Sequence, residues 1–146
     1  MKYEIQVDSD YPEPKVVIYT AGMTGEVSGL IRYLSEEPLG VITGFREERA
    51  YILEPEEIVR IFSGGGKVTA VTGKGAYGLR LRLYQVEERL DKDTFVRISN
   101  SEIVNLKKAL SFDLSFSGTI SIRLCDGTTS YVSRRYVPKI KKILGI

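Results

Sequence analysis

Histidine is absent from this sequence of 146 residues, which also contains one cysteine and no tryptophan. Without histidine, the chain lacks the commonest general base and the commonest metal ligand in proteins. The single Cys125 allows neither a disulfide within the chain nor a zinc site built from cysteine and histidine. We therefore expect no metal, no cofactor, no small-molecule substrate and no enzymatic activity.

Long apolar runs are missing as well. No stretch approaches the run of about 18 apolar residues that a membrane span requires. The opening Met-Lys-Tyr-Glu lacks the apolar core of a secretion signal. Hydrophobic residues make up 42% of the sequence and charged residues 27%, which is typical of a soluble globular protein. With so little cysteine, we expect a cytoplasmic protein that buries its core without disulfides.

Charge is distributed unevenly along the chain. Residues 1–60 hold 12 acidic and 6 basic side chains, a net charge of −6, whereas residues 61–146 hold 7 acidic and 15 basic ones, a net charge of +8. Such asymmetry indicates a basic surface that could bind a polyanion such as nucleic acid. The alternative is that basic residues collect in a C-terminal helix because the helix dipole favours them there.

The apolar patterns predict a mainly β, α+β protein with antiparallel strands. Alternation, β-branched residues and turn signals indicate strands over 2–7, 15–19, 40–45, 49–53, 58–62, 67–72, 79–83, 94–98, 110–116, 119–124 and 128–132. Helical spacing indicates helices over 24–37, 84–90 and 134–144. The Asp126-Gly127 pair predicts a two-residue hairpin.

A glycine-rich loop, Ser63-Gly-Gly-Gly-Lys67, connects two of these strands. It does not fit a nucleotide-binding P-loop, because Ile61 and Val68 stand where that motif needs Gly and Ser or Thr. One interpretation is a flexible hairpin turn. The other is a loop tip whose backbone amides and Lys67 side chain contact nucleic-acid phosphates.

Polar residues interrupt the chain directly after the strand at 94–98. Ser99 and Glu102 match a capping box, which predicts that a helix starts here. Asn100, one step into that turn, would then have a free amide that can bond to a base edge or a phosphate. A purely structural helix start remains the alternative.

Two arginines occupy an unfavourable position before the last helix. Ser133 is a candidate cap, so Arg134 and Arg135 fall in the first helical turn, where the helix dipole disfavours positive charge. Local rules of this kind tend to fail at functional sites, and arginine can bind guanine or phosphate. The alternative is that both arginines pair with carboxylates elsewhere in the protein.

Taken in order, these segments resemble the LytTR DNA-binding domain over roughly residues 47–146. Phe95-Val-Arg-Ile-Ser-Asn-Ser-Glu-Ile-Val-Asn105 is similar to the family's Phe-x-Arg-x-His-x-Ser-x-x-Val-Asn, with Ser99 in place of the usual histidine. Val132-Ser-Arg-Arg-Tyr136 is similar to its closing Val-Ser-Arg-x-Tyr. Weaker matches are Glu57–Ser63, residues 79–90, Phe116-Ser-Gly and Asp126-Gly127.

The resemblance implies an elongated antiparallel β fold that inserts loops into successive major grooves. By position, it implies that Asn100, Arg135 and Lys67 contact DNA, with Ser99, Ser133 and Arg134 in secondary roles. The implied function is a sequence-specific regulator of transcription that binds double-stranded DNA. The alternative is a protein-interaction module that has lost DNA binding, which the missing histidine favours.

Residues 1–46 are too short for the receiver domain that precedes most LytTR domains. The chain therefore resembles the small stand-alone LytTR regulators, in which a strand-helix segment replaces the receiver. That resemblance implies a homodimer and a small membrane protein as inhibitor. We expect the acidic segment 1–46 to form the surface for one of these partners.

Overall fold

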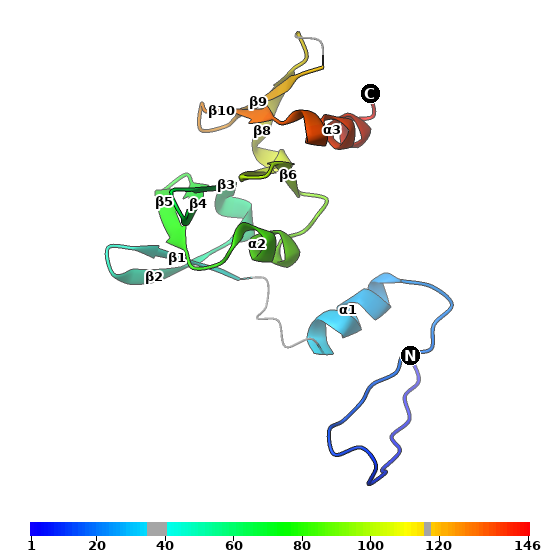
Figure 1. Cartoon of the computed structure of the whole chain (residues 1–146). Coiled ribbons are helices and arrows are strands. Elements are labelled where there is room, and N and C mark those ends of the chain that lie inside the picture. Colours follow the sequence, from blue (N-terminus) through cyan, green and yellow to red (C-terminus); the bar gives the residue numbers. More distant parts are fainter. Residues whose placement is uncertain (35–40, 116–117) are drawn as a thin grey trace. The chain divides into compact units, whose positions relative to one another are not determined.

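The structure is a computed structural model that describes residues 1–34, 41–115 and 118–146. The chain separates into two compact units, Met1–Glu37 and Pro38–Ile146 (Figure 1). The second unit includes residues 42–46, which the sequence analysis assigned to the N-terminal segment, because these residues pair into the large sheet.

The first unit contains one helix, α1 (Gly25–Leu34), in its described residues. Thr24 caps this helix as expected, since its hydroxyl accepts from the backbone N–H of Val27 at 3.3 Å. Residues 35–37 of the predicted helix lie outside the described part. The strands expected over 2–7 and 15–19 are wrong, because these residues form no strand and are almost all exposed. An isolated pair of strands is marginal in water, so β propensity alone does not stabilise one.

Seven antiparallel strands of the second unit form one sheet, in the order β2-β1-β5-β4-β3-β7-β6. The strands are β1 (Ile42–Arg46), β2 (Arg49–Leu53), β3 (Ile58–Gly64), β4 (Lys67–Thr72), β5 (Gly75–Leu79), β6 (Phe95–Ser99) and β7 (Glu102–Asn105). The predicted strands over 40–45, 49–53, 58–62, 67–72 and 94–98 are confirmed within a few residues of their bounds. Residue 40 of the first of these strands lies outside the described part. The β1–β2 turn holds Glu47 and Glu48 at φ of 51° and 64°.

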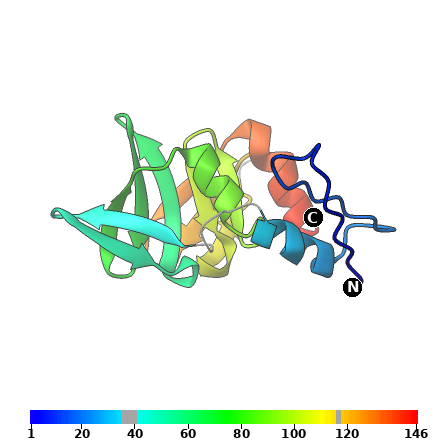
Figure 2. The ribbon, with the colours of Figure 1, turned by 90° about the horizontal axis from the view of Figure 1, so that it is seen from below.

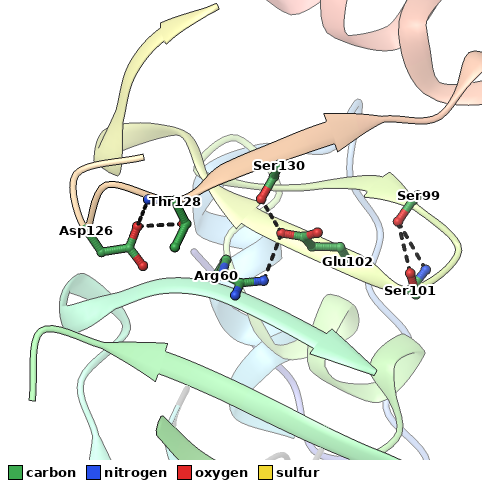
Figure 3. Close-up of polar contacts among 7 residues, drawn as sticks. All are labelled: Arg60, Ser99, Ser101, Glu102, Asp126, Thr128 and Ser130. Atoms are coloured by element: carbon green, nitrogen blue, oxygen red, sulfur yellow. Dashed lines mark hydrogen bonds and ion pairs between the residues drawn. The ribbon is translucent and has the colours of Figure 1, made fainter. Parts of the chain in front are cut away.

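Two local predictions in this sheet are wrong. The strand expected over 79–83 lies earlier, at β5, because pairing with β4 and β1 outweighs the glycines of that segment. The capping box does not start a helix either: residues 99–102 form the turn between β6 and β7. The Glu102 side chain bonds to Arg60 and Ser130 instead of capping (Figure 3).

A second, smaller sheet contains β8 (Ala109–Asp113), β9 (Ile120–Leu124) and β10 (Thr129–Val132), in the order β10-β9-β8. The predicted hairpin at Asp126-Gly127 joins β9 to β10, and Gly127 has a φ of 86°. The strand expected over 110–116 is β8, and residue 116 lies outside the described part. The predicted mainly β, antiparallel fold is therefore confirmed.

Helices cover the sheets of this unit. Helix α2 (Leu83–Arg89) agrees with the helix expected over 84–90, and α3 (Val137–Leu144) ends at Gly145. A 3-10 turn, η3 (Arg134–Tyr136), forms the first part of the predicted terminal helix, and η1 (Pro55–Glu57) and η2 (Leu106–Lys108) are further 3-10 turns. Figure 2 shows α2 beside the large sheet, with α3 farther along the unit.

Two hydrophobic cores stabilise the second unit. The first is formed by Ile42, Leu53, Ile58, Ile61, Ala70, Tyr77, Leu79, Leu83, Val86, Leu90, Phe95 and Ile103. The second is formed by Val59, Val96, Ile98, Val104, Ile120, Ile122, Leu124, Val132, Val137 and Ile140. Strands β3, β6 and β7 contribute to both cores, because neighbouring side chains of a strand point to opposite faces. These three strands join the two halves of the unit.

Candidate nucleic-acid interface

The turn between β6 and β7 presents Asn100 to solvent. Ser99 closes the turn from one side, since its hydroxyl accepts from the backbone N–H of Ser101 at 3.2 Å and lies 3.3 Å from the Ser101 hydroxyl (Figure 3). Ser99 is half-buried, whereas Asn100 and Ser101 are exposed. Asn100 therefore offers an amide donor and a carbonyl acceptor from a short, hydrogen-bonded turn.

Lys67 lies at the tip of the neighbouring β3–β4 hairpin. It begins β4 opposite Gly64, and the two residues between them, Gly65 and Gly66, have φ of 58° and 76°. Two successive positive φ values suit a tight hairpin turn, which explains the glycine run. The backbone N–H of Ser63 donates to the carbonyl of Ser101 at 2.8 Å. This bond shows that the hairpin tip and the Asn100 turn occupy the same end of the sheet.

The closing motif reaches that end from the small sheet. The backbone N–H of Ser133 donates to the carbonyl of Ile98 at 2.9 Å, and the Tyr136 hydroxyl donates to the Asn100 side-chain oxygen at 3.4 Å. Arg134 and Arg135 lie in η3 between these two contacts and are exposed. Ser133 occupies the N-cap position, although its side chain makes no capping bond.

The structure thus brings five of the six candidate residues into one group and places Lys67 on the adjacent hairpin. Tyr136 was part of the closing sequence pattern but was not predicted as a site residue. Its contact with Asn100 joins segments 36 residues apart, which no local pattern predicts. Arg97 was also missed, although its guanidinium donates to the carbonyls of Ser99 and Asn100.

Two acidic side chains bonded to residues around this group, Glu102 and Glu87, are paired. Glu102 accepts from Arg60 at 3.4 Å and from the Ser130 hydroxyl (Figure 3). Glu87 accepts from Arg97 at 3.2 Å. Residues 38–146 carry 12 acidic and 18 basic side chains, a net charge of +6. The net positive charge of these residues favours binding of a polyanion.

Asp126 stabilises the β9–β10 turn on the other side of Arg60. Its carboxylate accepts from the Thr128 backbone N–H at 3.0 Å and from the Thr128 hydroxyl at 2.6 Å. Partial burial raises the pKa of Asp126, but the Thr128 hydrogen bonds and the Arg60 guanidinium outweigh it and hold the pKa below its ordinary value. Asp126 is therefore ionised at neutral pH.

Two features are absent from the described residues. Over 1–34, 41–115 and 118–146, no three His, Cys, Asp or Glu side chains gather as a metal ion would require. Across the same residues, no helix has the length and apolar character needed to cross a membrane.

Known proteins resemble this chain along its whole length. An uncharacterized HTH-type transcriptional regulator of Staphylococcus aureus strain NCTC 8325 / PS 47 is 29% identical over 147 residues, covering 100% of this chain and 99% of its own length. A regulator with the same description from strain MSSA476 matches with the same identity and coverage.

The fold also has a counterpart among solved structures. The LytTr DNA-binding domain of a protein described as a methyl-accepting/DNA response regulator from Bacillus cereus superposes with a TM-score of 0.69 and 21% identity. The match covers 73% of this chain and 97% of that domain. The family model of the LytTr DNA-binding domain matches residues 48–145, which contain every residue of the candidate interface. The chain therefore belongs to the LytTR DNA-binding domain family.

Proposed function

We propose that this chain is a transcriptional regulator that binds double-stranded DNA sequence-specifically through the loops at the Asn100 end of the large sheet. The observation that carries the proposal is the meeting of the Asn100 turn with the closing motif, through the Ser133–Ile98 and Tyr136–Asn100 hydrogen bonds. Relatives named as transcriptional regulators support it. The function is binding without catalysis, and a cytoplasmic location follows from it.

Asn100 and Arg135 are proposed to read base edges. The amide of asparagine matches the donor and acceptor of adenine in the major groove, and the arginine fork matches guanine. Lys67, on its own hairpin tip, is proposed to contact the phosphate backbone beside an adjacent stretch of groove. Two such loop groups would enter successive major grooves of one duplex.

Ser99, Ser133 and Arg134 are proposed to contribute backbone contacts that orient the protein. Such contacts fix register without reading sequence. The Ser99 hydroxyl is already bonded within its own turn, where the family motif has an imidazole. That observation favours the second candidate function, a protein-interaction module that has lost DNA binding.

The experiment begins with selection of duplexes from a random library, followed by fluorescence anisotropy on the selected and a scrambled duplex. Asn100→Ala and Arg135→Ala should each weaken binding to the selected duplex alone, by about 1–3 kcal/mol. Lys67→Ala should weaken both duplexes and lower the slope of log affinity against log salt by about 0.9. Lys92→Ala, on the exposed loop at the opposite end of β6, is the matched control.

Two outcomes would contradict the proposal. If library selection enriches no sequence and the wild-type chain binds duplexes without preference, the interaction-module function is favoured instead. If Asn100→Ala and Arg135→Ala weaken both duplexes equally, these residues contact phosphates and the assignment of base readout is wrong.

We infer that the first unit forms the surface for a homodimer or for a small membrane protein that inhibits the regulator. Residues 1–37 carry 7 acidic and 3 basic side chains, a net charge of −4. Large side chains remain uncovered here: Tyr3, Val7 and Tyr19 are 88%, 98% and 94% exposed. We propose that these exposed side chains contribute to the interaction surface.

Sedimentation velocity tests this inference on the full chain and on a variant with Tyr3, Val7 and Tyr19 changed to serine. The substitutions should shift a dimer to a monomer, or abolish inhibition by a co-expressed membrane protein, while DNA affinity per subunit is retained. Unchanged oligomeric state together with unchanged inhibition would show that the first unit has neither role.

A further inference from the structure

Arg97 makes three hydrogen bonds, two of them to the Asn100 turn. Its Nε donates to the Ser99 carbonyl at 3.1 Å, and one terminal nitrogen donates to the Asn100 carbonyl at 2.6 Å. The other terminal nitrogen pairs with Glu87 of α2 at 3.2 Å. One side chain thus holds two successive peptide groups of the turn and links them to a helix.

The strand irregularity beside Arg97 explains why the turn needs such support. Arg97 pairs with Ile103 and Ser99 with Glu102, so Ile98 is an extra residue on β6. An extra residue of this kind is a β-bulge, which bends its strand and changes the direction of the side chains that follow. The Ile98 carbonyl is the group that accepts from Ser133, so the bulge also receives the closing motif.

The geometry of the Arg97 guanidinium suits it to bond to two neighbouring carbonyls of a turn. Its planar array of donors is rigid, so bonds to two carbonyls fix the orientation of both peptide planes at once. Hydrogen bonds from a charged donor are also stronger than neutral ones. Because the peptide groups on both sides of the Asn100 α-carbon are constrained, the direction of its side chain is constrained as well.

Glu87 completes the arrangement from outside the turn. The Arg97 side chain is 21% exposed and the Glu87 side chain 36% exposed. A pair with this exposure adds little to stability. Its effect is to orient the guanidinium and to neutralise a charge that would otherwise attract phosphate.

We propose that Arg97 is a positioning residue that sets base specificity by fixing the Asn100 turn, with Glu87 holding Arg97 in place. The proposal rests on the proposed function, since it concerns how Asn100 reads DNA. It differs from a phosphate-contact role for Arg97, which would raise affinity for every duplex alike.

The test measures the affinity of full-length variants for the selected and scrambled duplexes at roughly 100 and 200 mM salt. Arg97→Lys keeps the charge but cannot bond to two carbonyls and a carboxylate through a rigid fork. It should lose about tenfold or more in affinity for the selected duplex, the range expected for one misplaced base contact. Affinity for the scrambled duplex and its salt slope should stay unchanged.

Glu87 variants provide a matched series on α2. Glu87→Ala should weaken binding to the selected duplex, whereas Glu87→Gln should restore most of it, because the glutamine oxygen still accepts from Arg97. Glu88→Ala removes a neighbouring exposed carboxylate and serves as the control with unchanged affinity. Melting temperatures measured beside each titration separate positioning from loss of fold.

The outcomes are distinguishable. Equal losses on both duplexes with a lower salt slope would make Arg97 a phosphate contact and overturn the inference, as would unchanged specificity in Arg97→Lys. A wild-type chain without sequence preference would overturn the proposed function and the specificity role together. In that case, NMR of the free protein still tests whether the Arg97 hydrogen bonds hold the turn, since Arg97→Lys should shift the Asn100 and Ser101 amide resonances.

Discussion

Asn105→Ala is expected to destabilise the second unit strongly, although Asn105 belongs to the same motif as the exposed Asn100. Asn105 is 1% exposed at the end of β7. Its side-chain NH2 donates to the Ile58 carbonyl at 2.8 Å, and its side-chain oxygen accepts from the Lys107 backbone N–H at 2.9 Å. One amide thus joins the end of β7 to the beginning of β3 and caps the following 3-10 turn.

The magnitude follows from what the truncation leaves behind. The Ile58 carbonyl belongs to a fully buried residue, so loss of its partner costs about 1–3 kcal/mol. Lys107 is exposed and its N–H can bond to water, which limits that loss to about 0.5–1.5 kcal/mol. Together these give a decrease of about 1.5–4.5 kcal/mol in the free energy of unfolding. Urea denaturation followed by circular dichroism measures it.

Asn100→Ala is the matched control, because it makes the same substitution at an exposed position of the same hairpin. Its free energy of unfolding should change by less than about 0.5 kcal/mol, as is usual for surface sites. Asn105→Ala, measured at a temperature where it is folded, should retain its preference for the selected duplex. A loss below about 1 kcal/mol for Asn105→Ala would refute the reasoning, because it would mean that the buried bonds add little.

Three smaller predictions concern stability. Gly44→Ala should lower the free energy of unfolding by about 1–3 kcal/mol in a urea titration, because its Cβ would lie 2.7 Å from the Tyr77 Cβ. Glu102→Gln should lower the thermal midpoint, since it removes the charge that pairs with Arg60 at 3.4 Å. The pKa of Asp126 is lower in the folded protein than its unfolded value of 3.8, so the ionised carboxylate stabilises the fold at pH values above 3.8. This stabilisation is lost as the pH falls through the pKa of the folded protein. Asp126→Asn should therefore cost under about 1 kcal/mol at pH 7, and the difference should vanish in acid-unfolding titrations once the pH falls below the folded pKa of Asp126.

Sequence reasoning succeeded where a local signal determines the structure. The Asp126-Gly127 hairpin, the Thr24 cap and the alternating pattern of β9 depend on residues close together in the chain. A pair of positive φ values at the glycines of the β3–β4 tip follows from the same kind of signal. The resemblance over the second unit named Asn100 and the closing arginines as candidate residues, and the structure joins their segments through the Tyr136–Asn100 hydrogen bond.

It failed where distant residues outweigh a local preference. The Ser99 and Glu102 capping pattern is valid by itself, but Glu102 finds Arg60 on β3 and Ser130 on β10, and these partners hold it in a strand. The segment 2–7 has the residues of a strand but forms none, because the described part of the first unit contains no neighbouring strand with which it could pair. The bonds made by Arg97 depend on the bulge at Ile98, which no short pattern predicts.

The three strands that contribute to both cores have a mechanical consequence. Strands β3, β6 and β7 place alternate side chains, such as Ile58 and Val59, in different cores. Neither core can therefore unfold without displacing strands that also pack in the other core. The second unit should therefore unfold in a single calorimetric transition, despite its two cores. For a protein that binds a duplex, the same coupling keeps the distance between its candidate DNA-binding loops constant. The spacing between the Lys67 hairpin and the arginines before α3 is therefore fixed by the packing of the two sheets.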